Sequence, residues 1–357
     1  MQTQAKFRLL VVRLGAMGDI LHALPAVTAL RLAHPDWEIG WVVEPRWRAL
    51  LKAGTEGLGT RDSAQPLIDR LHFAAAKEWK RRPLSAETAR EIKALRGEMR
   101  GSGYDAVIDF QGAVRSAAIA RMAGCGRVIG ESHPREWAAR WLFSERVATR
   151  GKHVIEQDVE LASAVAGDAL SAARPLLPVD PAAEAWCDGL LRGGGGWPAA
   201  LIAPGAGWGA KRWPPGRYAA LAKGLAERGF RVLVNAGPGE EALAGEIVGG
   251  SGGAAEELRA SLEQLIALAR RIALCVGGDT GPLHLACALG RPVVGIYGPT
   301  DPGRNGPFRS HARVLRSPAS RRDHSRRAAP EAGLLTIAPE DVLRAAGELL
   351  MEGAENE

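Results

Sequence analysis

The sequence predicts an α/β protein with two domains, each built on a parallel, doubly wound sheet. The chain has 357 residues, and domains commonly hold about 100–200 residues each. Short apolar runs rich in β-branched residues alternate along it with amphipathic helical segments, which is the pattern of parallel sheets. Glycine-rich turns follow several of the predicted strands, at the strand ends where open α/β sheets bind ligands.

Composition and charge limit the possible function classes. A hydrophobic content of 46% with 24% charged residues is typical of a globular protein. We find neither an apolar run of about 18 residues nor the pattern of a signal peptide, so we expect a cytoplasmic protein. The four cysteines are scattered without metal-ligand spacing, which predicts reduced thiols and no metal site. A net charge of +6 leaves nucleic acid, a phosphorylated substrate or an anionic lipid surface open as partners.

The first domain opens with a β-α-β unit. Residues 7–13 and 38–43 are predicted strands, and residues 20–33 have helical periodicity. The turn between them lacks the phosphate-loop motif, and it only approaches the dinucleotide fingerprint because Arg13 replaces the first glycine. Glu44 could still serve as an acidic ribose partner, so a dehydrogenase remains an alternative.

Asp19 stands where we expect the N-cap of the first helix. It can accept hydrogen bonds from helix N–H groups, or it can act as a carboxylate base at the carboxyl end of a strand. Both interpretations stay open at this point.

Further elements of this domain carry basic residues. Residues 67–73 form a predicted strand, followed by a basic, aromatic-bearing loop at 77–83 that is either solvated or a clamp for an anionic acceptor. Helices are predicted at 86–100 and 153–166, and strands at 104–110 and 127–130. Gln111 and Arg115 lie at the turn after the strand that ends near Asp109.

A proline-containing stretch at 170–183 indicates a linker to the second domain. Strands at 199–203 and 231–235 flank a glycine-rich loop at 204–214, which carries Lys211, and a helix at 215–228. A last helix is predicted at 339–351.

The stretch 277–303 reads GGDTGPLHLACALGRPVVGIYGPTDPG. A strand at 272–276 leads into a glycine turn, a short helix at 282–289 and another strand at 292–297. The free N–H groups and the positive dipole end of that helix suit an anion such as a diphosphate, with Asp279 and His284 beside it. A capped turn without a ligand is the alternative.

Taken in order, four segments resemble glycosyltransferase family 9, the lipopolysaccharide heptosyltransferases. They read VVRLGAMGDILHALPAVTAL, YDAVIDFQGAVRSA, PGAGWGAKRWP and GGDTGPLHLACALGRPVVGIYGPTDPG, and the resemblance spans most of residues 7–310. It implies a GT-B fold, in which two Rossmann-like domains face each other across a cleft. The expected divisions are an acceptor-binding domain (1–170), a linker (171–184), a nucleotide-sugar-binding domain (185–335) and a C-terminal helix (336–357) that crosses back to the first domain.

The resemblance also implies the reaction. An inverting, metal-independent and cofactor-independent enzyme would transfer heptose from ADP-L-glycero-D-manno-heptose to a Kdo sugar of an anionic lipid A-type acceptor. Such an enzyme would contact the inner face of the inner membrane peripherally and would not bind nucleic acid. The first and last segments look more like heptosyltransferase I, and the PGAGWGAKRWP loop more like heptosyltransferase II. Ala206 and Gly207 stand where type I tends to have hydroxyl residues.

Single residues take roles from the family motifs. Asp19 matches the general base. The donor-binding matches are Lys211, Glu241, Asp279, Thr280, Gly281 and His284, and the acceptor-binding matches are Lys77, Lys80, Arg81, Gln111 and Arg115. The neighbouring Glu240 leaves the ribose-binding position open by one residue. A GT-B sugar-nucleotide epimerase, another family-9 transferase and a non-catalytic binder of nucleic acid or anionic surfaces remain alternatives.

Overall fold

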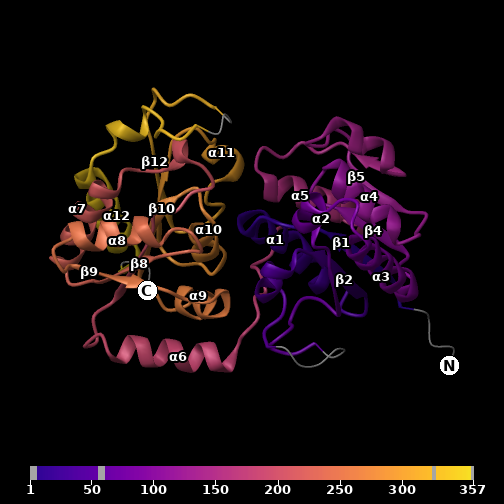
Figure 1. Cartoon of the computed structure of the whole chain (residues 1–357), viewed down its shortest axis with the longest axis horizontal. Coiled ribbons are helices and arrows are strands. Elements are labelled where there is room, and N and C mark those ends of the chain that lie inside the picture. The colour runs from indigo at the N-terminus through magenta and orange to yellow at the C-terminus, as the bar shows by residue number, and fades with distance from the viewer. Residues whose placement is uncertain (1–5, 55–60, 324–326, 355–357) are drawn as a thin grey trace. The chain divides into compact units, whose positions relative to one another are not determined.

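The computed structural model describes residues 6–54, 61–323 and 327–354. The chain forms two compact units, Met1–Val179 and Asp180–Glu357, shown from indigo to magenta and from magenta to yellow in Figure 1. The point of division lies within the predicted linker, residues 171–184. The two units are described separately below.

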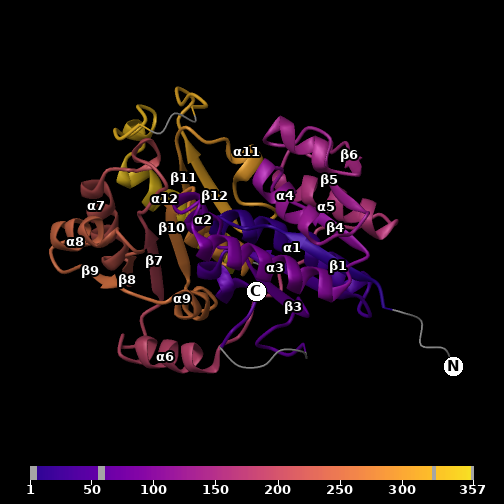
Figure 2. The same ribbon diagram turned by 45° about the vertical axis from the view of Figure 1, so that its right-hand side comes forward.

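The first unit is a six-stranded parallel sheet with the order β3-β2-β1-β4-β5-β6. Its strands are β1 (Arg8–Val12), β2 (Glu38–Val43), β3 (Arg70–Phe73), β4 (Ala106–Asp109), β5 (Val128–Glu131) and β6 (Glu145–Val147). Figure 2 shows β6 beside β5 at one edge. This order is that of the doubly wound dinucleotide-binding fold, so the predicted α/β class is confirmed for this unit.

Helices cover both faces of this sheet. They are α1 (Met17–Ala33), α2 (Ala76–Arg81), α3 (Ala86–Ser102), α4 (Val114–Met122) and α5 (Val154–Ala166), with 3₁₀ turns η1 (Pro45–Leu50) and η2 (Trp137–Leu142). Helices α1 and α5 pack on each other. Leu10 and Val12 of β1 join Leu95 and Met99 of α3 in one buried apolar cluster that also contains residues of α4. Alternate strand residues therefore supply the core on each face.

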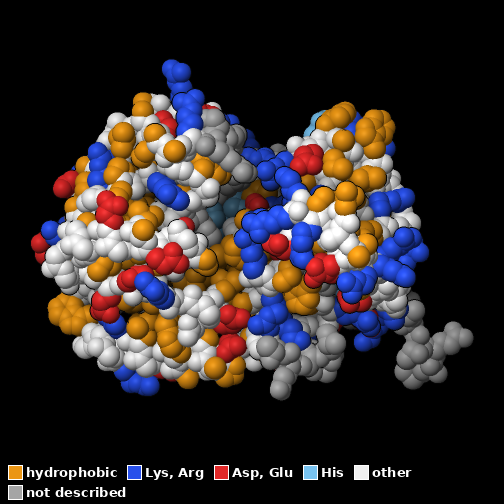
Figure 3. All heavy atoms as spheres, viewed as in Figure 1, with side chains coloured by type: hydrophobic (Ala, Val, Ile, Leu, Met, Phe, Trp, Pro, Cys, Tyr) orange, Lys and Arg blue, Asp and Glu red, His pale blue; other side chains and the backbone are white. Residues whose placement is uncertain are grey.

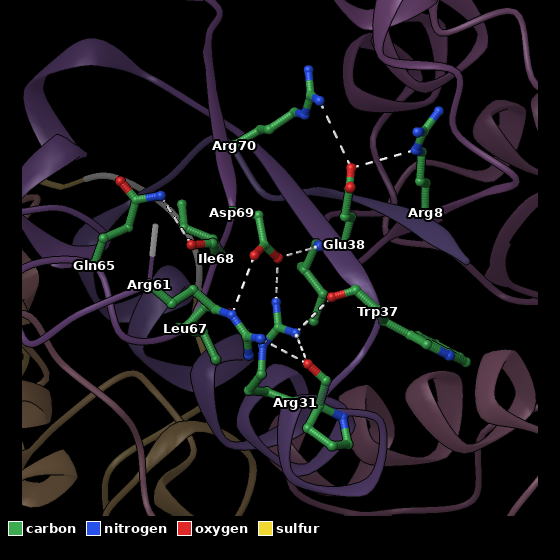
Figure 4. A network of polar contacts seen from close by, with 12 residues as sticks. Arg8, Arg31, Trp37, Glu38, Arg61, Gln65, Leu67, Ile68, Asp69 and Arg70 are labelled. Atoms are coloured by element: carbon green, nitrogen blue, oxygen red, sulfur yellow. Dashed lines mark hydrogen bonds and ion pairs between the residues drawn. The ribbon is translucent and has the colours of Figure 1, made fainter. Parts of the chain in front are cut away.

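A buried ion pair ties α1 to the β2–β3 edge of the sheet (Figure 4). The Arg31 guanidinium pairs with Asp69 and also donates to the Leu67 and Trp37 carbonyl oxygens, at 3.0 and 2.7 Å. Asp69 in turn accepts a hydrogen bond from the Ile39 amide at 2.8 Å. Burial lowers the pKa of Arg31, which the negative charge of Asp69 opposes. Because its hydrogen-bonding groups are partnered in this way, the charge is tolerated beside the core.

The second unit repeats the same architecture. Its sheet has the order β12-β11-β10-β7-β8-β9, which is the order of the first sheet when strands are counted from β7. The strands are β7 (Ala199–Ala203), β8 (Arg231–Asn235), β9 (Ala255–Leu258), β10 (Leu274–Gly278), β11 (Val293–Tyr297) and β12 (Ala312–Arg316). All neighbouring strands pair in parallel. The sequence contains no repeat strong enough to indicate this shared topology.

Helices again lie on both faces. They are α6 (Pro181–Arg192), α7 (Pro215–Ala226), α8 (Glu241–Gly250), α9 (Leu262–Ala269), α10 (Gly281–Ala288), α11 (Pro302–Asn305) and α12 (Pro339–Ala354), with 3₁₀ turns η3 (Gly209–Lys211) and η4 (Leu334–Thr336). The last helix, α12, packs on α7, β11 and β12, and its Val342 and Leu349 are fully buried. It therefore contributes to the core of the second unit, and its return to the first domain stays a prediction.

Several elements differ from the sequence-based expectation. The strand predicted at 272–276 is β10, Leu274–Gly278, and helix α11 was not predicted. The strands β6, β9 and β12 were not predicted, and each is an edge strand. The segment expected to be a basic loop at 77–83 forms helix α2 over most of its length. The Trp79 indole N–H donates to Glu91 on α3 at 2.7 Å, which fixes this short helix against the longer one.

No helix in the described part of the chain combines the length and apolarity that crossing a membrane requires.

Candidate functional site

Each sheet reverses its strand order at one position, between β1 and β4 in the first unit and between β7 and β10 in the second. Ligands of open α/β sheets bind at such switch points, outside the carboxyl ends of the strands. The loops that leave β1, β4, β7 and β10, together with the first turns of the helices that follow them, carry most of the residues predicted to be functional. Each unit thus has its own candidate edge, and we describe the two edges in turn.

Arg13 and Asp19 form the centre of the first edge. Arg13 directly follows β1, and only 7% of its side chain is exposed. Its guanidinium lies 3.1 Å from the Asp19 carboxylate, donates to the Asp19 backbone oxygen at 3.2 Å and also bonds the Phe110 carbonyl oxygen after β4. The Asp19 side chain is 43% exposed. The edge therefore presents an accessible carboxylate whose position is fixed by a buried cation.

Asp19 is not the N-cap residue that the sequence suggested. The N-cap of α1 is Ala16, and Asp19 lies in the first turn, where its carboxylate accepts a hydrogen bond from the Ala16 amide at 2.9 Å. Capping and an exposed carboxylate therefore occur together, because one oxygen bonds the turn while the other pairs with Arg13.

Glycine is required in this turn at Gly15. Its φ angle is +149°, and a Cβ atom there would lie 2.6 Å from the Trp47 indole nitrogen. A side chain at this position would displace the ring or the turn. The Trp47 ring therefore packs directly against the turn that precedes Asp19 in the chain.

Asp109, at the end of β4, anchors the neighbouring loop. It is 1% exposed and accepts hydrogen bonds from the Gln111 and Gly112 amides and from the Ser116 hydroxyl, at 2.7, 3.1 and 2.8 Å. Burial raises its pKa to about 6, although these hydrogen bonds oppose the increase. The Gln111 side-chain oxygen accepts from the Leu14 amide at 3.0 Å. The predicted acceptor residue Gln111 therefore also links the β1 and β4 loops.

We expect Asp109 to make stability depend on pH. Its pKa in the folded protein, about 6, exceeds the ordinary value of 3.8, so the folded state binds this proton more tightly than the unfolded state does. The stabilisation that protonated Asp109 contributes to the free energy of unfolding is full below about pH 4, and it is lost as pH rises through about 6. Between about pH 4 and pH 7 the wild type should lose on the order of 3 kcal/mol relative to Asp109→Asn. Denaturant unfolding across that range measures the difference, and parallel pH profiles would contradict the assignment.

The basic residues predicted to bind the acceptor are exposed. Lys77, Lys80 and Arg81 lie on α2, which follows β3, and Arg81 pairs with Glu78 one turn away at 3.1 Å. Arg115 is exposed in the first turn of α4, just beyond the Asp109 loop. These side chains follow β3 and β4, at the same end of the sheet as Asp19, and are accessible to an anionic ligand.

A buried triad forms the centre of the second edge. The Lys211 ammonium lies 2.5 Å from one oxygen of Asp279, and the His284 Nε2 atom lies 2.8 Å from the other. The Lys211 and Asp279 side chains are only 10% and 11% exposed. Burial raises the pKa of Asp279, but the His284 hydrogen bond and the Lys211 charge outweigh it, so the pKa lies well below its usual range. The carboxylate is therefore ionised at neutral pH, and Lys211 is held directly beside the start of α10.

The start of α10 combines a helix N-terminus with unpaired polar atoms. Thr280 is the N-cap residue by backbone geometry, but its side chain forms no cap hydrogen bond. Its hydroxyl oxygen is buried without a hydrogen-bond partner among the described residues. The same holds for the hydroxyls of Tyr297, at the end of β11, and Thr300, just beyond it, and for the Trp208 indole nitrogen. Buried polar groups normally find partners. Such groups at one sheet edge indicate a place where a polar ligand completes the hydrogen bonding, and sequence patterns alone did not indicate Tyr297, Thr300 or Trp208.

The two candidate ribose ligands lie differently. Glu241 is exposed in the first turn of α8, and its carboxylate accepts from the Gly239 amide at 3.1 Å. Glu240 accepts from the Gly237 amide at 3.1 Å, and its carboxylate lies so close to Gly205 that a Cβ atom there would be 2.0 Å from it. Glu240 therefore reaches the loop after β7.

Within each unit, the structure brings together most of the predicted site residues. Gln111 accepts a hydrogen bond from the Leu14 amide, in the loop that leads to Asp19. Lys211, Asp279 and His284 touch directly, beside Thr280 and Gly281. The structural role of Arg13 was missed, because the sequence indicated only that it interrupted a glycine motif.

Comparison with known proteins shows which family the chain belongs to. The profile of glycosyltransferase family 9 (heptosyltransferase) matches residues 92–334. Lipopolysaccharide heptosyltransferase 1 of Escherichia coli K12 is 32% identical over 317 residues, which is 87% of this chain and 94% of that protein. The enzyme of the same name from Pseudomonas aeruginosa is 29% identical over 314 residues, covering 84% and 81% of the two chains.

Solved structures extend the match to the whole fold. The structure of E. coli heptosyltransferase WaaC with ADP has a TM-score of 0.77 at 27% identity and covers 96% of this chain and 100% of its own. That of E. coli ADP-heptose lipopolysaccharide heptosyltransferase II has a TM-score of 0.76 at 23% identity, with 98% and 100% covered, and shares the fold. These matches confirm the predicted GT-B fold and the predicted enzyme class. The chain therefore belongs to glycosyltransferase family 9, the heptosyltransferases.

Proposed function

We propose that this enzyme transfers a heptose from ADP-L-glycero-D-manno-heptose to a Kdo sugar of the lipopolysaccharide inner core, with inversion at the anomeric carbon. The observation that carries the proposal is the buried Lys211–Asp279 pair at the start of α10, in a chain 32% identical to a lipopolysaccharide heptosyltransferase 1 over most of its length. Heptosyltransferase I rather than II is favoured because relatives of the first type match over 317 residues, whereas the E. coli type 2 relative matches over 152.

The second edge suits the donor diphosphate. Lys211 offers a positive charge, the N-terminus of α10 offers free N–H groups, and Thr280 offers an unpaired hydroxyl. All three stabilise negative charge as the bond between the anomeric carbon and the phosphate oxygen breaks and ADP leaves. Glu240 and Glu241 both remain candidates for the ribose, and the contact of Glu240 with the β7 loop favours Glu240.

The first edge suits the acceptor. Asp19 takes the proton of the attacking hydroxyl while that oxygen bonds to the anomeric carbon, so one displacement inverts the configuration. Arg13 keeps the carboxylate in place through its bonds to Asp19 and Phe110. The exposed Lys77, Lys80, Arg81 and Arg115 are expected to bind the acidic groups of the acceptor.

A transfer assay tests the proposal. The purified chain, incubated with the ADP-heptose and Kdo-lipid A, should release ADP only when the acceptor is present and should add one heptose mass to the lipid. ADP-sugars should also raise the melting temperature more than UDP-sugars do. A change in the donor sugar without acceptor would indicate an epimerase instead, and preference for an already heptosylated acceptor would indicate the type II reaction. Because the acceptor is a lipid, we further propose peripheral contact with the inner face of the inner membrane.

A further inference from the structure

One surface of the first unit is unusual for a protein exterior. The 3₁₀ turn η2 carries Trp137 and Trp141, whose side chains are 56% and 70% exposed. By contrast, Trp41 and Trp213 are fully buried in the sheets' cores. Figure 3 shows hydrophobic side chains gathered on the surface over the magenta segment that follows β5 in Figure 1. Exposed aromatic patches of this kind mark interaction surfaces.

Arginines accompany the two rings. The Arg140 guanidinium lies 4.0 Å from the ring centre of Trp137 and 5.5 Å from that of Trp141, and Arg146 lies 5.9 Å from the latter. Stacking on the aromatic faces holds both cations beside the rings. Arg146 is exposed, and Arg140 is half-buried. We call Trp137, Arg140, Trp141 and Arg146 the aromatic–arginine patch.

The surroundings of the patch are positive. Residues 132–152 contain five basic residues and two acidic ones. Both acidic side chains are already engaged: Glu136 accepts from the Val114 amide at 2.8 Å, and Glu145 pairs with Arg127 at 2.9 Å. The excess of basic residues gives the segment a net positive charge, which complements an anionic partner.

The patch is held on a rigid base. On the inner side of η2, Ala139 is fully buried, and Phe143, which follows it, is 4% exposed. Both belong to the apolar cluster beneath the sheet. The tryptophans thus face outward because the other side of η2 is anchored in the core.

We infer that the aromatic–arginine patch docks the enzyme on the surface of an anionic phospholipid bilayer. Tryptophan rings favour the level of the lipid headgroups, where one part of the ring is apolar and the N–H group is hydrated. Arginine pairs with lipid phosphates, and each basic residue near an anionic surface adds to the attraction. The net charge of +6 acts in the same direction. This docking needs neither substrate, so it is separable from the proposed transfer reaction.

Vesicle sedimentation tests the inference. The full-length chain should bind vesicles of phosphatidylglycerol and phosphatidylcholine, and phosphatidylcholine vesicles much less. The double variant Trp137→Ala/Trp141→Ala should weaken binding about tenfold or more. The double variant Arg140→Gln/Arg146→Gln should weaken it by a similar factor, and its difference from the wild type should become smaller at high salt. Trp197→Ala is the matched control, because Trp197 is 57% exposed on the second unit, and it should bind as the wild type does.

Several results would overturn the inference. They are failure of the wild type to bind anionic vesicles, equal binding by the tryptophan double variant with an unchanged melting temperature, or an equal loss with Trp197→Ala. If the double variant instead dissociated a dimer and left vesicle binding unchanged, the patch would join two copies of the chain. The patch variants should retain transfer activity on an acceptor dispersed in detergent. If the proposed reaction were wrong, this activity assay would show it, and vesicle sedimentation would be unaffected.

Discussion

Replacing Asp19 with asparagine should lower kcat about 10²–10⁴-fold, the usual contribution of a positioned general base. Asparagine nearly matches aspartate in size but cannot take the proton of the attacking hydroxyl. The side chain is 43% exposed and forms its contacts within the loops of one sheet edge, so the fold should survive. Initial rates with saturating donor and acceptor measure the effect.

The control is Asp168→Asn, which changes an exposed aspartate that follows α5. It should leave kcat unchanged. The Asp19 variant should still be stabilised by ADP, because the proposed nucleotide residues lie in the second unit. Turnover within about tenfold of the wild type would remove Asp19 from the role of base.

Lys211→Met should reduce both donor binding and chemistry. Loss of one positioned charge on the leaving diphosphate is expected to cost about 10²–10³-fold in kcat. The same change leaves the 11%-exposed Asp279 without its cation, so the pKa of Asp279 should rise, and stability should fall by on the order of 3 kcal/mol. Steady-state kinetics and thermal unfolding with and without ADP measure the two effects.

A double variant separates catalysis from stability. Lys211→Met/Asp279→Asn removes both charges of the pair, so it should recover much of the lost stability while activity stays low. Lys223→Met, at an exposed position on α7, is the matched control and should change neither activity nor stability. Recovery of donor affinity in the double variant would mean that Lys211 only neutralises Asp279.

The sequence predicted the central strands well because those strands are buried on both faces. β2, β7 and β8 have the predicted bounds, since continuous apolar runs mark strands in the middle of a parallel sheet. Of the edge strands, β6 is mostly exposed and β12 is mostly half-buried, and β9 is buried only at its two end residues. Their sequences contain charges and give no apolar run, so they could not be recognised.

The candidate site was predictable where the chemistry depends on turns and helix starts. Asp19, Lys211 and Asp279 all follow a predicted strand and a glycine-containing turn, and each lies at a switch point in the structure. Contacts between residues far apart in the chain were not predictable. The bond from Arg13 to Phe110 joins loops 97 residues apart, and the reach of Glu240 to Gly205 depends on tertiary packing that no local pattern specifies.

The separation of the two sheets along the chain affects how the polypeptide folds during synthesis. Each sheet is assembled entirely from one continuous half of the chain, on either side of Val179 and Asp180. The leading half can therefore complete its hydrogen-bonded ladder while the trailing half is still being synthesised, as domains that emerge first from the ribosome generally do. Hybrid genes that exchange halves between relatives at this junction would leave every ladder intact, which makes it a natural place for recombination.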